Sequence, residues 1–97
     1  MEKEEIKSLL QAAVERYGIS HQIRMAIEEM AELIDALMKR TRARRTDADV
    51  ITEIADVTIM MKQLMLIFGE SAVRDEIDRK LNRLKERMDG RDEEAVL

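Results

Sequence analysis

The sequence has no cysteine, no proline, three glycines and two aromatic residues, Tyr17 and Phe68. The absence of cysteine excludes a disulfide framework and any thiolate metal site. The scarcity of turn formers and aromatic residues, with 45% hydrophobic and 39% charged residues, is typical of a helical protein. A chain of 97 residues is expected to form one small domain, whose core is modest in a monomer.

Long apolar runs and an excess of positive charge are also missing. The most apolar segment, residues 57–68, is shorter than the roughly 20 residues that span a bilayer. The first ten residues, MEKEEIKSLL, are acidic and amphipathic, unlike a signal peptide. The net charge of −4 argues against a dedicated nucleic-acid binder. We therefore expect a soluble, cytoplasmic protein with no membrane or nucleic-acid partner.

Apolar residues recur with helical spacing along most of the chain, which predicts an all-α fold. The expected helices are residues 2–16, 20–42, 46–68 and 71–88. Short connections between helices of this length favour an antiparallel four-helix bundle-like subunit. We expect residues 1–89 to form this domain and residues 90–97 to form a loosely ordered tail. Because residues 57–68 are apolar on nearly all sides, we also expect a homo-oligomer, either a homodimer or a homotetramer.

Four acidic residues lie in apolar surroundings on the second and third expected helices. They form an ExxE pair, Glu29 and Glu32, and an ExxD pair, Glu53 and Asp56. None of the four has a basic residue three or four positions away, where a helical ion pair would form. A turn at residues 44 and 45 would bring the two pairs together, displaced by roughly 6 Å along the helix axes. The ligand that best neutralises such an all-oxygen cluster is Mg²⁺, with Mn²⁺ as a substitute.

The residues around these acids resemble those of a known family. The segments YGISHQIRMAIEEMAELIDALMKR, DVITEIADVTIMMKQL and KLNRLKER are similar to the MazG-like family of all-α nucleoside triphosphate pyrophosphohydrolases. That family is marked by an ExxE pair, a spacer and an ExxD pair, and here the spacer has 20 residues. The resemblance covers residues 16–88 and includes the hydrophobic context as well as the acids.

The resemblance implies an enzyme that hydrolyses nucleoside or deoxynucleoside triphosphates to the monophosphate and pyrophosphate, with Mg²⁺ as cofactor. A role in clearing unwanted nucleotides would fit such an activity. The residues that the resemblance assigns are Glu29, Glu32, Glu53 and Asp56 as metal ligands and catalytic acids, Lys80 and Arg83 as phosphate-binding residues, and His21, Gln22 and Asn82 as candidate nucleotide-binding residues. Which acid activates the attacking water is left open. Glu28 is either an additional ligand of the metal, a residue that contacts one of the ligands, or an ion-pair partner of Arg24.

Three other functions compete with this one. A di-iron bundle needs two Glu-x-x-His motifs, but the chain has a single histidine. A non-catalytic helical oligomerisation or interaction module would need neither metal nor nucleotide. Nucleic-acid binding would use the segment KRTRARR, residues 39–45, in which five of seven residues are basic. The overall acidity and the few aromatic residues argue against this last function.

Overall fold

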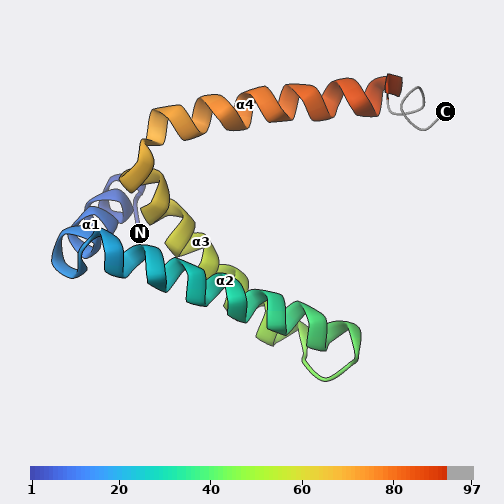
Figure 1. Ribbon diagram of the computed structural model, residues 1–97, viewed down its shortest axis with the longest axis horizontal. Helices are drawn as coiled ribbons and strands as arrows, with labels where there is room; N and C mark the ends of the chain where they lie inside the picture. The colour runs from blue at the N-terminus through green and yellow to red at the C-terminus, as the bar shows by residue number, and fades with distance from the viewer. Residues whose placement is uncertain (92–97) are drawn as a thin grey trace. The chain divides into compact units, whose positions relative to one another are not determined.

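The computed structural model describes residues 1–91, and within that range the chain is helical without any strand. The elements are α1 (Lys3–Tyr17), α2 (Ile19–Thr41), α3 (Asp47–Phe68), α4 (Glu70–Glu86) and a π-helical turn, η1 (Arg87–Arg91) (Figure 1). The all-α prediction is confirmed, and each expected helix boundary agrees with the observed one to within two residues. Most of the expected tail, residues 92–97, lies outside the described residues. The chain divides into two compact units, residues 1–67 and 68–97.

A single glycine separates α1 from α2. Gly18 has φ of 90°, a conformation that side chains other than that of glycine rarely adopt. Its N–H bonds to the carbonyl of Val14 and closes α1, while its carbonyl accepts the N–H of Gln22 and opens α2. The second helix was expected to begin at residue 20. It begins at Ile19, and its N-cap is Gly18.

Helices α2 and α3 run side by side as an antiparallel hairpin (Figure 1). Gln22, near the start of α2, donates a 2.7 Å side-chain hydrogen bond to Gln63, near the end of α3. At the other end of the hairpin, Arg40 of α2 forms a 2.6 Å ion pair with Asp47 of α3. These two contacts, near opposite ends of the helices, establish the antiparallel direction.

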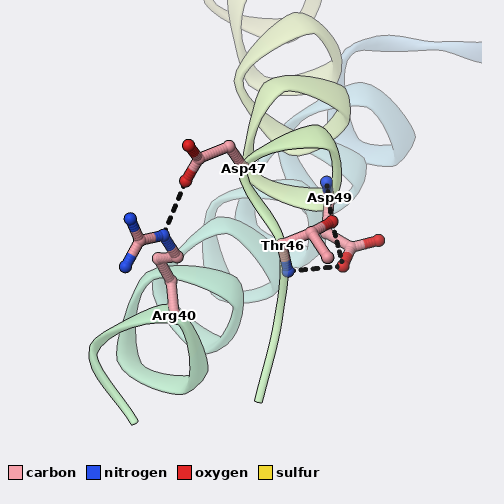
Figure 2. A network of polar contacts seen from close by, with 4 residues as sticks. All are labelled: Arg40, Thr46, Asp47 and Asp49. Carbon is pink, nitrogen blue, oxygen red and sulfur yellow. Dashed lines mark hydrogen bonds and ion pairs between the residues drawn. The ribbon is translucent and has the colours of Figure 1, made fainter. Parts of the chain in front are cut away.

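The beginning of α3 is stabilised by a reciprocal cap. The hydroxyl of Thr46 accepts the backbone N–H of Asp49 at 3.3 Å, and the Asp49 carboxylate accepts the backbone N–H of Thr46 at 3.0 Å (Figure 2). This arrangement is a capping box, which satisfies donors that have no partner within the helix. In the turn before it, Ala43 has φ of 56°, an uncommon value for a residue with a side chain. The turn and the cap together determine where α3 begins.

The core of the first unit is small. The buried apolar residues among the described ones are Leu10, Ala26, Ala36 and Met60. Two of these four residues are alanines, which bury little apolar area. Many large apolar side chains of α2 and α3 remain exposed in the single chain, including Ile34 (63% exposed) and Ile51 (65%).

The second unit contains α4 and η1. Ion pairs at helical spacing line α4, between Arg74 and Glu70 and between Arg79 and Glu76. Such exposed pairs add little to stability, because water and salt screen their charges. The apolar residues that recur with helical spacing along α4 are mostly exposed, with Leu81 at 56%. Within residues 1–91, no helix is both long enough and apolar enough to cross a membrane.

Candidate metal site between α2 and α3

The hydrogen bond between Gln22 and Gln63 sets the register of the two helices. Counting seven residues inward from this pair along both helices places Glu29 opposite Asp56, and counting ten places Glu32 opposite Glu53. The turn was expected at residues 44 and 45, with the acid pairs displaced along the axes. That register is wrong, because the centre of the hairpin falls between residues 42 and 43. The observed register therefore puts the two acid pairs level with each other.

Three carboxylates meet in this register. Glu29 of α2 and Glu53 and Asp56 of α3 each offer one oxygen, and these oxygens all lie within 4.8 Å of one another. We call these three residues the carboxylate cluster. All three are half-buried, whereas Glu32 is exposed and lies outside the group. Two of the cluster's oxygens, Glu29 Oε2 and Glu53 Oε2, are buried without a hydrogen-bond partner.

The cluster is electrostatically strained when it has no cation. Burial, followed by the negative charges of Glu32, Asp56, Glu53 and Glu28, raises the pKa of Glu29 above its usual value. Burial raises the pKa of Glu53 as well, and Glu32 and Asp56 add to the effect. Although Glu32 is exposed, its charge is the largest electrostatic contribution to the raised pKa of both residues. All four of the acids identified in the sequence therefore contribute to the negative electrostatic potential at the cluster.

A hard divalent cation fits this donor set. Buried carboxylate oxygens without partners cost free energy, and a cation that binds them removes this cost. The cluster supplies only oxygen donors, which Mg²⁺ and Mn²⁺ prefer over nitrogen or sulfur. Three converging carboxylates also leave coordination positions for water and for phosphate oxygens, as is usual for protein-bound Mg²⁺.

Glu28 lies beside the cluster on α2. Its side chain is exposed, and its charge is the smallest of the contributions that raise the pKa of Glu29. Glu28 and Arg24 both lie within the described residues 1–91, and the structure shows no ion pair between them. A role as an additional metal ligand, or as a residue that contacts a ligand, stays a prediction for Glu28.

The two candidate nucleotide-binding residues of α2 form a polar chain with Gln63. The side chain of Gln22 is buried, and its oxygen lies 2.7 Å from Nδ1 of the exposed His21, so Nδ1 is the donor. The Gln63 amide in turn contacts Met60 Sδ at 3.5 Å. Sequence reasoning missed Gln63 as a partner, although its position seven residues after Asp56 places it on the same face of α3.

The candidate residues of α4 belong to the second unit. Lys80, Asn82 and Arg83 are all exposed on this helix. Glu76 lies four residues before Lys80, where a helical ion pair could form, but it pairs with Arg79. The hydrogen bond and charge of Arg79 lower the pKa of Glu76.

The basic segment 39–45 lies at the turn of the hairpin. Lys39 and Arg45 both contact Asp35, at 3.0 Å and 3.5 Å, and Arg40 pairs with Asp47. Three of the five basic residues in this segment are therefore ion-paired within the chain, which weakens the case for nucleic-acid binding. Hydrogen bonds with Thr46 lower the pKa of Asp49, and the charge of Arg45 adds to this effect. The same charge partly offsets the raised pKa of Glu53. Sequence reasoning missed the effect of Arg45 on Glu53, because the two residues are eight positions apart and a helical ion pair spans three or four.

A scan of protein-family models, a search of the curated proteins and a search of the solved structures find no match to this chain.

Proposed function

We propose that the chain is a magnesium-dependent hydrolase that converts nucleoside or deoxynucleoside triphosphates to the monophosphate and pyrophosphate. The observation that carries the proposal is the convergence of the carboxylate cluster from two helices, with two buried oxygens that lack a hydrogen-bond partner. The resemblance of the surrounding sequence to the MazG-like family supplies the reaction. Clearance of unwanted nucleotides is the role that this activity would serve.

The proposed reaction breaks one phosphoanhydride bond. The oxygen of water bonds to the α-phosphorus, the bond from that phosphorus to the α–β bridging oxygen breaks, and pyrophosphate leaves with the bridging oxygen. Bound Mg²⁺ supplies neutralisation of the negative charge on the phosphate oxygens. The carboxylate cluster and Glu32 hold the ion, and one of these carboxylates orients the water and accepts its proton.

Other residues of the chain are assigned to substrate binding. Lys80 and Arg83 of α4 are proposed to contact the phosphates, and His21 and Asn82 to contact the nucleoside. Gln22 was a candidate for the same task. Its burial and its bond to Gln63 support a different task for it, which is to maintain the register that brings the cluster together.

We also propose that the chain is a four-helix bundle-like subunit of a cytoplasmic homodimer or homotetramer. The exposed apolar side chains support this proposal. Ile59 and Met61 in the apolar part of α3 are 49% and 45% exposed in the single chain, and Phe68 at its end is 66% exposed. Burial of apolar area stabilises association by about 25 cal/mol per Å² before the costs of association are counted.

The function is tested by incubating the protein with a panel of nucleoside and deoxynucleoside triphosphates and Mg²⁺ while pyrophosphate release is followed. The proposal expects magnesium-dependent release with at least one nucleotide. Glu53→Gln is expected to abolish it, because the substitution removes a charged ligand while keeping the side chain's shape. Glu15→Gln, an exposed change on α1, is the matched control and keeps the parent rate. Equal rates for Glu53→Gln and the parent would refute the assignment.

The alternative is a non-catalytic helical oligomerisation or interaction module, and the same exposed apolar residues favour it. The two functions differ in their need for metal. A module would associate equally well with and without Mg²⁺ and would release no pyrophosphate from any nucleotide in the panel.

A further inference from the structure

Arg45 occupies a distinctive position relative to the carboxylate cluster. It follows the left-handed Ala43 in the turn and directly precedes Thr46, the cap of α3. Its side chain is 33% exposed, which makes it the most buried basic side chain among the ion pairs described for this chain. An arginine held in this way has already lost part of its conformational freedom, and it therefore loses less when it binds a ligand.

The contact that Arg45 makes in this structure is weak. Its Nη2 lies 3.5 Å from Asp35 Oδ2, at the limit of a hydrogen bond. The same Asp35 oxygen is already paired with Lys39 Nζ at 3.0 Å. Since a guanidinium carries five N–H donors, most of the hydrogen-bonding capacity of Arg45 is unused by this contact.

Arg45 lies at one end of a row of acidic residues that leads to the cluster. Asp49 follows it by four residues, and Glu53 and Asp56 follow Asp49 at helical spacings of four and seven on one face of α3. Asp49 is engaged in the cap with Thr46. The charge of Arg45 acts on both Asp49 and Glu53, so its field reaches the cluster.

We propose that Arg45 is a phosphate-binding residue. Its guanidinium separates from Asp35 and binds a polyphosphate chain. The other oxygens of that chain lie at the metal held by the carboxylate cluster. This inference rests on the proposed function and adds a residue that the family resemblance does not assign. Asp35 is the resting partner that the ligand replaces. Arginine suits the task because its planar fork can donate two parallel hydrogen bonds to one phosphate.

The test is calorimetric titration of the protein with inorganic tripolyphosphate in the presence of Mg²⁺, which needs no catalysis. Arg45→Gln is expected to weaken tripolyphosphate binding about tenfold to a hundredfold, because hydrogen bonds to a charged group are lost. Arg44→Gln is the matched control, since Arg44 is an exposed arginine in the same turn. It is expected to bind tripolyphosphate within about twofold of the parent. Arg45→Lys keeps the charge without the fork and recovers part of the affinity.

Asp35→Asn separates phosphate binding from a purely structural ion pair. If Arg45 serves only to pair with Asp35, this variant and Arg45→Gln weaken binding alike, and the inference is overturned. If Arg45 binds phosphate, Asp35→Asn frees it, and tripolyphosphate binds as tightly as to the parent or more tightly. Unchanged binding by Arg45→Gln, or an equal loss in Arg44→Gln, would also overturn the inference.

Titration with Mg²⁺ alone distinguishes this inference from the proposed function. The inference expects Arg45→Gln to bind Mg²⁺ at least as well as the parent, because a neighbouring positive charge is removed. If both proteins bind Mg²⁺ and have equal affinity for tripolyphosphate, the role of Arg45 is refuted, but the proposed metal site is not. Absence of magnesium binding by the parent would refute both.

Discussion

Gln22 and Gln63 form a buried side-chain hydrogen bond of 2.7 Å between α2 and α3, two helical turns from the carboxylate cluster. A slip of one helix along the other would break this bond and leave the Gln22 N–H donor and the Gln63 side-chain oxygen buried without each other. A single buried polar residue specifies register in the same way in coiled coils. The pair therefore links the packing of the hairpin to the site, because only the observed register brings the carboxylates level.

Gln22→Ala is expected to lower the free energy of unfolding by roughly 1–3 kcal/mol, because it leaves the side-chain oxygen of Gln63 buried without its donor. Urea denaturation measures the change. Gln11→Ala, an exposed glutamine change on α1, is the control and should alter stability by less than about 0.5 kcal/mol. Replacing both Gln22 and Gln63 with leucine should lower the free energy of unfolding less than Gln22→Ala does. It should still weaken magnesium binding, because no polar pair then specifies the register of the two helices. Equal stability of Gln22→Ala and Gln11→Ala would contradict this account.

Magnesium is expected to raise the melting temperature of the protein, because an ion that binds only the folded state stabilises it. At a concentration one hundred times the dissociation constant, the stabilisation is about 2.7 kcal/mol. Thermal unfolding with increasing Mg²⁺ measures it. Glu29→Gln should abolish the shift, while Glu15→Gln on α1 should retain it. An equal shift in Glu29→Gln and the parent would mean that the ion binds elsewhere.

The sequence predicts the helices well because their stability depends on local features. Apolar periodicity and the glycines at positions 18 and 69 locate the ends of α1 and α3, and both glycines adopt positive φ. The acids of the site could also be recognised, since none of them has a basic neighbour at helical spacing. These properties depend on residues close together in the sequence, so tertiary packing does not alter them.

The register and the polar partners could not be predicted in the same way. The register depends on the turn, in which Ala43 adopts a left-handed conformation that an alanine does not signal in a sequence. The contact of Arg45 with Asp35 crosses that turn, and the bond of Gln22 to Gln63 joins residues 41 positions apart. Such contacts are consequences of the hairpin geometry, and a search at helical spacings does not find them.

The metal-free protein is expected to lose stability as the pH rises through the raised pKa values of Glu29 and Glu53. The folded state binds protons at these residues more tightly than the unfolded state, whose pKa is near 4.5. Their stabilising contribution is therefore complete below that pH and is lost as the pH increases through the folded values.

Comparison with the double variant Glu29→Gln/Glu53→Gln isolates this effect. Melting temperatures in a chelator are measured between about pH 4 and pH 8. The variant should match the parent at the acidic end and become progressively more stable than the parent as the pH rises. Asp49 and Glu76, whose pKa values are lowered, titrate in both proteins, so their effect cancels in the difference. A constant difference across the range would contradict the raised pKa values.

Thr46→Ala is expected to destabilise the protein by about 1 kcal/mol, because it removes the hydroxyl that caps α3. Thr52→Ala is the matched control. Its hydroxyl bonds to the carbonyl of Ala48 inside the helix, where alanine has the higher helix propensity. Chemical denaturation should therefore show a loss for Thr46→Ala and none for Thr52→Ala. Similar losses in both variants would show that the hydroxyl of Thr46 has no special role.

Ile59→Lys is expected to shift the protein from oligomer to monomer. Ile59 is 49% exposed in the single chain and lies in the apolar part of α3, so an interface between copies would bury it. A lysine there would place a charge in an apolar contact, which costs far more than the same charge on an exposed surface. Analytical ultracentrifugation across a range of concentrations measures the mass directly.

Thr52→Lys introduces the same charge at an exposed polar position of α3 and serves as the control. It should sediment with the parent as a dimer or tetramer, while Ile59→Lys sediments at the mass of one chain. A monomeric parent would refute the proposed assembly. It would also leave the exposed apolar side chains of α2 and α3 in water, a state that few stable proteins of this size tolerate.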